Sequence, residues 1–358
     1  MNNGFEIVRP EGVTTDWLTR ALQGRGIDAT VDRFTMDVVG TGQLGETRRF
    51  NLTYRGAAPA HAPKSLVGKF SSADATAAES GKTIGFYRAE VMFYRELADR
   101  ARIRIPAVYV AELDEANDFA LLFEDLAPAR VGDQMRGCSV EEARLALKEA
   151  ALLHATFWND RELMAQPWLL VPEGAQAFYT TDLIEQSWDH VKKNYDGRLT
   201  PDVVAVCEKF VRNHAYWNRP RDFPKCLSHN DFRPDNMLFG GADGRVAIVD
   251  WQTSAFLGIG MDPAYFLGAI FDRDTRKANE RGLLKGYYDD LVALGVTGYS
   301  FDQLLRHYAH YSFAAIVVAV AATMIVKRTD RGDTLFMHMI TGAAHQALDN
   351  DALDDLPE

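Results

Sequence analysis

The spacing of hydrophobic and polar positions changes about a third of the way along the chain. Up to residue 126, short apolar runs alternate with turns rich in Gly, Pro, Asn and Asp, which predicts β-strands. Beyond residue 126, apolar residues recur three and four positions apart over long segments, which predicts amphipathic helices. We therefore expect an α+β fold with a strand-rich lobe, residues 1–126, and a mainly helical lobe, residues 127–358.

The strand-rich lobe is expected to hold an antiparallel sheet and two helices. The predicted strands span Phe34–Val39, Thr47–Tyr54, Ser65–Phe70, Pro106–Val110 and Phe119–Phe123. One helix is expected near Val13–Leu22 and a second over Ile84–Leu97. In the second helix Glu90 falls on the apolar face, where a carboxylate is costly unless it has a partner.

The helical lobe contains seven predicted helices. They cover Ser139–Trp158, Thr181–Tyr195, Pro201–Trp217, a short segment capped by Asp262, 278–294, 301–327 and 333–349. The longest apolar run, Phe313–Val326, is too short to span a membrane and predicts a core helix. The acidic tail Asp349–Glu358 is expected to fray.

A β-hairpin is predicted inside this lobe. Met237–Phe239 and Val246–Val249 are short apolar runs separated by a turn that contains three glycines. A hairpin brings its ends together, so Asp231 and Asn236 are expected close to Asp250. Carboxylate and carboxamide oxygens are hard donors, which suits Mg²⁺.

The spacing His229-x-Asp231-x4-Asn236, with Asp250 after the hairpin, is that of a kinase catalytic loop. In this interpretation Asp231 accepts the proton of an attacking hydroxyl, while Asn236 and Asp250 hold the metal. The alternative is an acidic loop capped by polar turn residues.

A glycine-rich loop lies between the first two predicted strands. Gly40, Gly42 and Gly45 form a literal G-x-G-x-x-G, and a strand follows where a dinucleotide fold would have a helix. This context favours a hairpin whose backbone N–H groups cover phosphates. An ordinary glycine-rich turn is the alternative.

A lysine interrupts the third apolar strand. Lysines in such strands usually extend from an edge toward water, but Lys69 could also reach nucleotide phosphates, with Glu90 as its partner. Glu124 and Leu126 lie at the expected lobe boundary, where backbone groups would hold adenine.

Composition narrows the class of protein. The formal net charge of −11 disfavours a nucleic-acid binder. Three cysteines without a C-x-x-C pair indicate a reducing compartment. The N-terminus shows neither a basic start nor an apolar core of a signal peptide. We expect a cytoplasmic protein that binds neither nucleic acid nor membrane.

Together these motifs resemble the aminoglycoside phosphotransferase and choline kinase-like superfamily, in particular a bacterial branch near the ecdysteroid kinase-like proteins and hydroxyacyl-CoA kinase domains. The residues that carry the resemblance are the run from His229 to Phe239, Val249–Gln252 and Glu124–Leu126. The resemblance implies a two-lobed protein-kinase-like fold. It also implies ATP- and Mg²⁺-dependent phosphorylation of a hydroxyl on a small molecule.

The resemblance assigns a role to each matching residue. Asp231 would be the catalytic base, Asn236 and Asp250 the Mg²⁺ ligands, and Lys69 the phosphate contact, held by Glu90. Asp262 would brace the catalytic loop. There are two departures from the pattern: Asn230 replaces the usual glycine, and Trp251-Gln252 stands where protein kinases have Phe-Gly, which argues against a protein substrate.

Two other functions are compatible with the sequence, a catalytically silent nucleotide-binding protein and a non-enzymatic interaction protein. The complete set of motif residues favours the enzyme. The acceptor stays open: an aminoglycoside would need carboxylates, an acyl-CoA would need basic residues such as Arg130, Arg136 or Arg233, and a sterol would need aromatic residues. The sequence does not distinguish a preference for ATP from one for GTP, and it does not indicate the oligomeric state.

Overall fold

The computed structural model describes residues 4–40, 44–170 and 178–358 and divides the chain into two compact units. The first unit contains Met1–Ala129 together with Ala247–Thr253. The second contains Arg130–Val246 and Ser254–Glu358. Asp250 therefore belongs to the strand-rich unit, although the segments on both sides of it in the sequence belong to the helical one.

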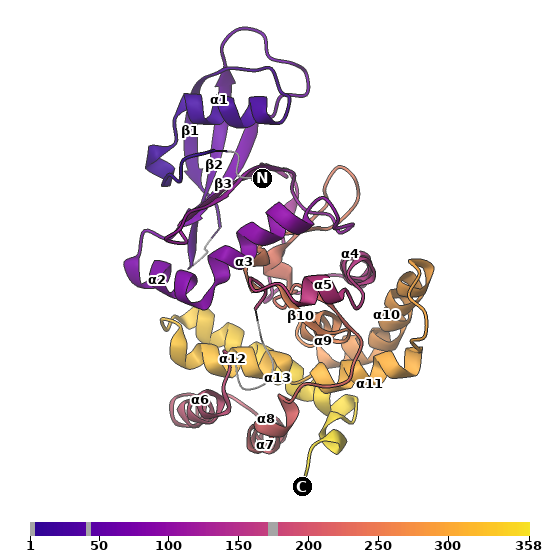
Figure 1. The fold of residues 1–358 in the computed structure, drawn as a ribbon. Coiled ribbons are helices and arrows are strands. Elements are labelled where there is room, and N and C mark those ends of the chain that lie inside the picture. Colours follow the sequence, from indigo (N-terminus) through magenta and orange to yellow (C-terminus); the bar gives the residue numbers. More distant parts are fainter. Residues whose placement is uncertain (1–3, 41–43, 171–177) are drawn as a thin grey trace. The chain divides into compact units, whose positions relative to one another are not determined.

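The first unit is built on a five-stranded antiparallel sheet with the order β1-β2-β3-β5-β4 (Figure 1). Its strands are β1 (Val31–Val38), β2 (Gly45–Tyr54), β3 (Ser65–Ser71), β4 (Val108–Leu113) and β5 (Phe119–Glu124). Each corresponds to one predicted strand, which confirms the expected antiparallel sheet.

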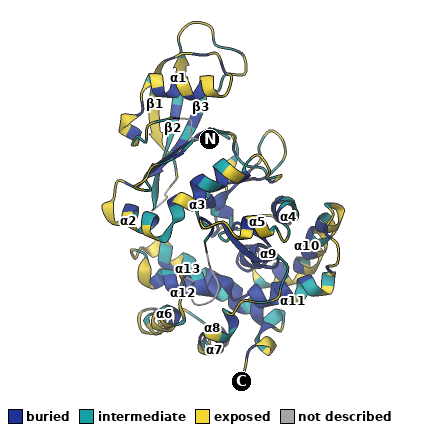
Figure 2. Cartoon of the chain, in the orientation of Figure 1, coloured by how far each residue is buried: buried dark blue, intermediate teal, exposed yellow. Residues whose placement is uncertain are grey.

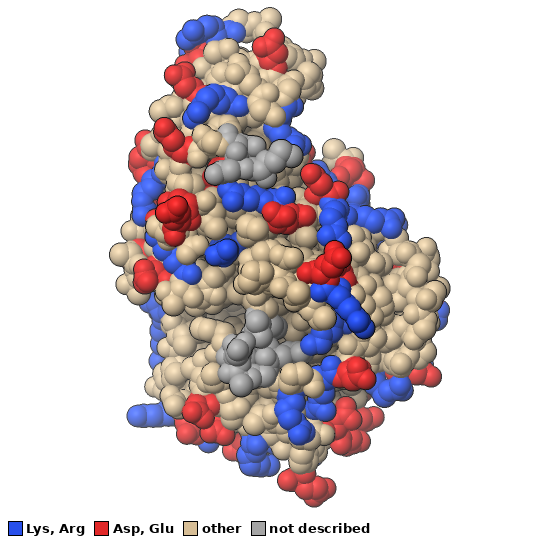
Figure 3. All heavy atoms as spheres, viewed as in Figure 1, with Lys and Arg blue, Asp and Glu red and all other residues tan. Residues whose placement is uncertain are grey.

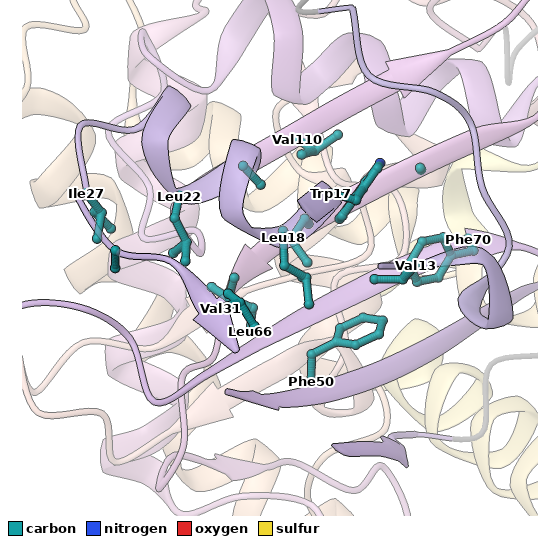
Figure 4. Packing of buried hydrophobic residues seen from close by; sticks show 14 residues of the cluster. Val13, Trp17, Leu18, Leu22, Ile27, Val31, Phe50, Leu66, Phe70 and Val110 are labelled. Atoms are coloured by element: carbon teal, nitrogen blue, oxygen red, sulfur yellow. The ribbon is translucent and has the colours of Figure 1, made fainter. Parts of the chain in front are cut away.

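Helix α1 (Thr15–Gly24) covers one face of this sheet and closes the core of the unit. The Thr14 side chain caps it by accepting a hydrogen bond from the Trp17 backbone N–H at 3.1 Å. Leu18 and Leu22 point from the helix toward the strands of the sheet that carry Phe50 and Leu66 (Figure 4), and all four side chains are fully buried. Burying one leucine contributes about 1.5–3 kcal/mol, so this apolar face holds the helix in place.

The chain between β3 and β4 forms two helices, of which only the second was expected. Helix α2 (Ala75–Ile84) is capped by Asp74, whose side chain accepts from Ala77 N at 2.9 Å. Gly85 then takes a left-handed conformation, with φ of 90°, and separates α2 from α3 (Phe86–Met92). A π-helical turn, Phe93–Leu97, extends α3. The predicted apolar face is confirmed, because Glu90, Phe93 and Leu97 are all buried.

The second unit is mainly helical and contains two small strand pairs. β6 (Arg130–Val131) pairs with β8 (Met237–Phe239), and β7 (Lys225–Ser228) pairs with β10 (Ala255–Gly258). The second strand of the expected hairpin is β9 (Ala247–Ile248), in the first unit. The helices are α4 (Val140–Thr156), α5 (Arg161–Met164), α6 (Thr181–Asn194), α7 (Pro201–Arg212), α8 (His214–Trp217), α9 (Met261–Leu267), α10 (Arg273–Ala293), α11 (Phe301–Tyr311), α12 (Ala314–Ile325) and α13 (Asp330–Asp349).

Four local predictions for this unit were wrong. The helix expected over 201–217 is divided at Asn213, and the one expected over 301–327 is divided between α11 and α12. Asp262 does not cap α9, because the helix begins at Met261 and Gly260 precedes it. The tail is not frayed, since it forms a 3₁₀ turn, Ala352–Asp355, that buries Ala352.

One helical stretch in the described part of the chain, Phe301–Ile325, is long and apolar enough to cross a membrane by length and composition. Of its most apolar window, 78% is buried inside the protein. Figure 2 shows most of α12 as buried. The stretch therefore has the burial of a core helix.

The charged side chains on the face shown in Figure 3 are mixed in sign. Lys and Arg alternate with Asp and Glu, and no broad basic area is visible there.

Candidate active site

Lys69 lies at the centre of a charged cluster in the first unit. Its Nζ donates to both Glu90 oxygens, at 2.8 and 2.7 Å, and to Asp250 Oδ1 at 2.9 Å. The strand β3 supplies the lysine and α3 supplies the glutamate. The pairing of Lys69 with Glu90, predicted from the helix periodicity, is present.

Asp250 is held in this cluster by an unusual backbone conformation and by its neighbour. Its φ of 69° lies in the left-handed region, which costs a residue with a side chain about 1–2 kcal/mol. The next residue, Trp251, is fully buried and stacks on Phe93 with ring centroids 3.8 Å apart. The stacked pair fixes the segment, so the strain is offset by packing.

The cluster contains one more negative than positive charge. Burial lowers the pKa of Lys69, but Asp250 and Glu90 outweigh this effect and raise it above its ordinary value. Burial raises the pKa of Glu90 to about 7, despite the opposing effect of Lys69. Lys69 is thus firmly protonated, and Glu90 takes up a proton more readily than an ordinary glutamate.

The structure describes both ends of the glycine-rich loop, and the end at Gly45 lies beside Lys69. Gly40 has a φ of 74°, which only glycine adopts without strain. A Cβ on Gly45 would lie 3.1 Å from the Phe70 carbonyl oxygen and 3.5 Å from Lys69 Cε, so a side chain there would crowd the lysine. Tyr87 fixes the loop by donating its hydroxyl to the Leu44 carbonyl. Gly42 lies outside the described residues.

Glu124 is the last residue of β5, and Leu126 follows it shortly before the first segment of the unit ends at Ala129. Glu124 Oε2 accepts from Arg104 Nη1 at 3.2 Å and from the Ala107 N–H at 3.1 Å. The Leu126 carbonyl accepts from Ala129 N at 2.9 Å. The Glu124 side chain is therefore used within the unit, and adenine binding near it stays a prediction.

In the second unit, Asp262 holds the beginning of the catalytic loop. Its Oδ2 accepts from His229 N at 2.8 Å and its Oδ1 from Asn230 N at 2.9 Å. His154 Nε2 lies 3.0 Å from the same carboxylate, and the other ring nitrogen lies 2.6 Å from the Tyr287 hydroxyl. Asp262 is fully buried, and these bonds confirm that it braces the loop.

The structure accounts for asparagine in place of the usual glycine. Asn230 has a φ of 64°, in the left-handed region. Glycine adopts this region freely, and asparagine is the residue with a side chain that tolerates it best. Asparagine is therefore compatible with a left-handed turn at this position, where glycine would also fit.

Asp231 lies at the centre of the loop, and both of its oxygens accept hydrogen bonds. Oδ1 accepts from the Tyr265 hydroxyl at 3.0 Å, and Oδ2 accepts from Asn236 Nδ2 at 2.8 Å. Arg233 Nε lies 3.1 Å from Oδ1 and 3.2 Å from Oδ2. Asp231 and Asn236 are thus brought together as the motif predicted.

These contacts keep Asp231 ionised. Burial by itself raises the pKa of Asp231, but the charges of Arg233 and His229 and the hydrogen bonds from Asn236 and Tyr265 lower it below its ordinary value. Burial raises the pKa of Tyr265 well above the usual range, so its hydroxyl remains a donor. A carboxylate in this state can orient a hydroxyl and accept its proton as phosphoryl transfer proceeds.

Each of the two predicted metal ligands, Asn236 and Asp250, keeps one unused oxygen, but the two residues belong to different units, so a shared Mg²⁺ site stays a prediction. Asn236 Nδ2 donates to Asp231, which leaves the amide Oδ1 without a hydrogen-bond partner in the described part of the chain. Asp250 Oδ2 is likewise unused there, because Lys69 bonds only Oδ1. No group of three or more His, Cys, Asp or Glu that could hold a metal occurs among the described residues. Mg²⁺ needs few protein oxygens and keeps water and phosphate oxygens as its other ligands.

Sequence reasoning missed two groups around Asp231. Tyr265 was not noted, and Arg233 was considered only as a contact for acyl-CoA. A signal for Tyr265 existed, because Asp262 and Tyr265 are three residues apart and so share one face of α9. The nearness of Asp231 to Asp250 stays a prediction, because these residues belong to different units.

Comparison with known proteins gives a family match over most of the chain. The model of a family described as "Ecdysteroid kinase-like family" matches residues 44–296. An uncharacterized kinase-like protein of Caenorhabditis elegans is 27% identical over 120 residues, which are 33% of this chain and 32% of that protein. The chain thus matches about a third of the length of this curated relative.

Solved structures show the fold. A putative aminoglycoside phosphotransferase of Ralstonia eutropha has a TM-score of 0.54 at 13% identity, over 95% of this chain and 98% of its own. A spectinomycin phosphotransferase, solved with ADP and spectinomycin, has a TM-score of 0.50 at 14% identity, over 95% and 99%. At such identity these neighbours establish the architecture, which is that of protein-kinase-like phosphotransferases.

Proposed function

Because the chain belongs to the ecdysteroid kinase-like family, we propose that it is an ATP-dependent O-phosphotransferase that phosphorylates a hydroxyl of a small molecule. The observation that carries the proposal is the Lys69 cluster. One buried ammonium is shared by Glu90 and Asp250, which leaves an excess negative charge. A structural ion pair needs only one carboxylate, whereas a site for Mg²⁺ and phosphate uses a lysine together with a second carboxylate.

Each residue has a defined part in the proposed reaction. Lys69 contacts the nucleotide phosphates, and Asn236 and Asp250 would hold Mg²⁺, which supplies neutralisation of the phosphate charge. The acceptor oxygen forms a bond to the γ-phosphorus, and the bond from that phosphorus to the β,γ-bridging oxygen breaks, so that ADP leaves. Asp231 takes the proton of the acceptor hydroxyl.

The contacts of Arg130 and Arg233 help to decide whether the acceptor could be an acyl-CoA. Arg233 is paired with Asp231, and Arg130 is paired with Glu142 and lies over the Phe239 ring. Two of the three arginines considered for an acyl-CoA are therefore already neutralised by carboxylates. This weighs against an acceptor that carries several phosphates.

The test is phosphate transfer from ATP with Mg²⁺ to three acceptor classes, an aminoglycoside, an acyl-CoA and a sterol, extended to simple alcohols. We expect one class to raise ADP release and to gain a phosphate detectable by mass. Asp231→Asn is the matched control, because it keeps the shape and removes the base. If the protein binds Mg·ATP but phosphorylates no acceptor, it is a silent nucleotide binder; if it binds no nucleotide, the proposal is wrong.

A further inference from the structure

A cavity of about 240 Å³ opens on the helical unit, and none of the residues assigned to catalysis lines it. Its walls come from α8, the segment that follows it, α11 and the C-terminal 3₁₀ turn, which lie together near the C-terminus in Figure 1. The lining residues are Tyr216, Arg221, Phe223, Arg306, His307, His310 and Asp355.

Arg221 lines the cavity and is held in place by Tyr216. Its guanidinium lies over the Tyr216 ring, 4.8 Å from the centroid, and its Nη2 donates to the Tyr216 carbonyl at 3.2 Å. Its Nε is buried and has no hydrogen-bond partner among the described residues. A ligand in the cavity would therefore be bound by the terminal Nη groups of Arg221, because the buried Nε offers it no accessible surface.

The charge of the lining is positive, in contrast to the acidic protein as a whole. Arg221 and Arg306 contribute two positive charges, and Asp355 is the single carboxylate in the lining. No ion pair within 4.0 Å joins Asp355 to either arginine in the described part of the chain. Both guanidinium groups are therefore available to an incoming anion.

Two neutral histidines complete the wall. Burial lowers the pKa of His307 to about 4, and that of His310 to about 3. His307 is oriented by a 2.9 Å contact from Nδ1 to the Tyr299 hydroxyl and stacks on Phe223 with centroids 3.9 Å apart. Imidazole N–H groups held in this way can donate to oxygen.

We propose that this cavity binds a phosphate group, either free phosphate or a small phosphate monoester. Four donor side chains reach the cavity from two separate segments, which suits a tetrahedral anion with several acceptor oxygens better than a planar carboxylate. The cavity volume of about 240 Å³ is more than a phosphate group alone fills. A compact organic group beside Phe223 and Tyr216 would occupy the remainder.

The chain offers a matched control for the charge of Arg221. Arg219 also lies over the Tyr216 ring, at 4.0 Å, and donates its Nε to the Tyr216 carbonyl at 3.2 Å, but it does not line the cavity. Arg219→Gln and Arg221→Gln thus remove the same charge from the same surroundings. Only the second removes a donor from the cavity.

Calorimetric titration of the full chain with inorganic phosphate, and separately with glycerol phosphate, tests the proposal. Arg221→Gln should weaken binding about tenfold, the effect expected for one charged hydrogen bond. Arg306→Gln should weaken it several-fold, Arg219→Gln should leave it within about twofold, and Asp355→Asn should strengthen it. Tighter binding of glycerol phosphate would identify a monoester as the ligand, and equal binding would identify free phosphate.

The variant Lys69→Met distinguishes phosphate bound in the cavity from phosphate bound at the proposed catalytic residues. Phosphate bound there would be lost in this variant and kept in Arg221→Gln, a result that would overturn the proposal. Arg306 is exposed, so Arg306→Gln tests the cavity even if Arg221→Gln disturbs the fold, which circular dichroism reports. Equal weakening in Arg219→Gln and Arg221→Gln, or no saturable binding in the millimolar range, would also contradict it.

Discussion

Removing the positive charge of the Lys69 cluster should destabilise the protein far more than removing one of its negative charges. In Lys69→Met the side chain keeps its length, but Glu90, which is 1% exposed, loses the partner that donates to both of its oxygens. Breaking a buried ion pair by removing one member typically costs about 3–5 kcal/mol, because the remaining charge is buried without compensation.

Glu90→Gln is the matched opposite change. Lys69 keeps its bond to Asp250 at 2.9 Å, so no charge is left unpaired. The cost should be about 1–3 kcal/mol, the range for a lost hydrogen bond to a charged group. The double variant should be more stable than Lys69→Met alone, since it no longer contains the uncompensated carboxylate.

The pH dependence of Lys69→Met follows from the buried carboxylate. Burial raises the pKa of Glu90, and the loss of Lys69 removes an influence that lowers it. A group with a raised pKa in the folded state binds its proton more tightly there, so the folded state gains stability as the pH falls through that pKa. The deficit of the variant should therefore be larger at pH 8 than at pH 5.

Urea unfolding followed by tryptophan fluorescence, at both pH values, measures these differences for wild type, the two single variants and the double variant. The unfolding curves of a chain with two units need not be two-state, so the transition that responds to Lys69→Met is the one to compare. The reasoning is refuted if Glu90→Gln costs as much as Lys69→Met. Strict additivity in the double variant would refute it as well.

Three further predictions concern the catalytic loop and the metal ligands. Asp231→Asn should lower kcat by a factor of about 10²–10⁴ and leave the affinity for Mg·ATP unchanged, whereas Asp250→Asn should lower both kcat and this affinity. Thermal-shift titration with Mg·ATP measures the affinity, and a turnover assay measures kcat. Equal losses of affinity in the two variants would contradict the assignment. Arg233→Gln should raise the pKa of Asp231, so the fall of kcat/KM at acid pH should begin at a higher pH than in wild type; an unshifted profile would show that Arg233 does not act on this carboxylate. Asn230→Val should cost about 1–2 kcal/mol because of the left-handed backbone, while Asn230→Gly should be nearly neutral, as measured by denaturant midpoint; equal costs would argue against strain at this position.

The sequence alone predicted features that depend on neighbours close along the chain. The five strands of the sheet and the apolar face that carries Glu90 follow from periodicities of two and 3.6 residues. The pairing of Lys69 with Glu90 spans only 21 positions and joins two elements, β3 and α3, that are separated by α2 alone. The catalytic-loop spacing likewise brings Asp231 and Asn236 together within one turn.

Local sequence patterns failed to predict the role of Asp262 and the structure of the C-terminal tail, which both depend on tertiary packing. Asp262 has the sequence signature of a helix cap, yet its carboxylate accepts from two backbone N–H groups of the catalytic loop, 32 and 33 positions away. The acidic tail looks disordered by composition, but Ala352 finds an apolar surface to bury against. In both cases the partner lies in a different part of the chain, so no local pattern records it.

By itself, then, the sequence determined which residues have the chemistry for phosphoryl transfer, because residue type and short-range spacing are written directly in it. Only the tertiary structure decided which other groups contact those residues. It brings Tyr265 to Asp231 across 34 positions and Asp250 to Lys69 across 181, and it leaves the Nε of Arg221 buried beside a cavity. Such contacts depend on how elements pack, and packing is set by the whole chain at once rather than by any one stretch of it.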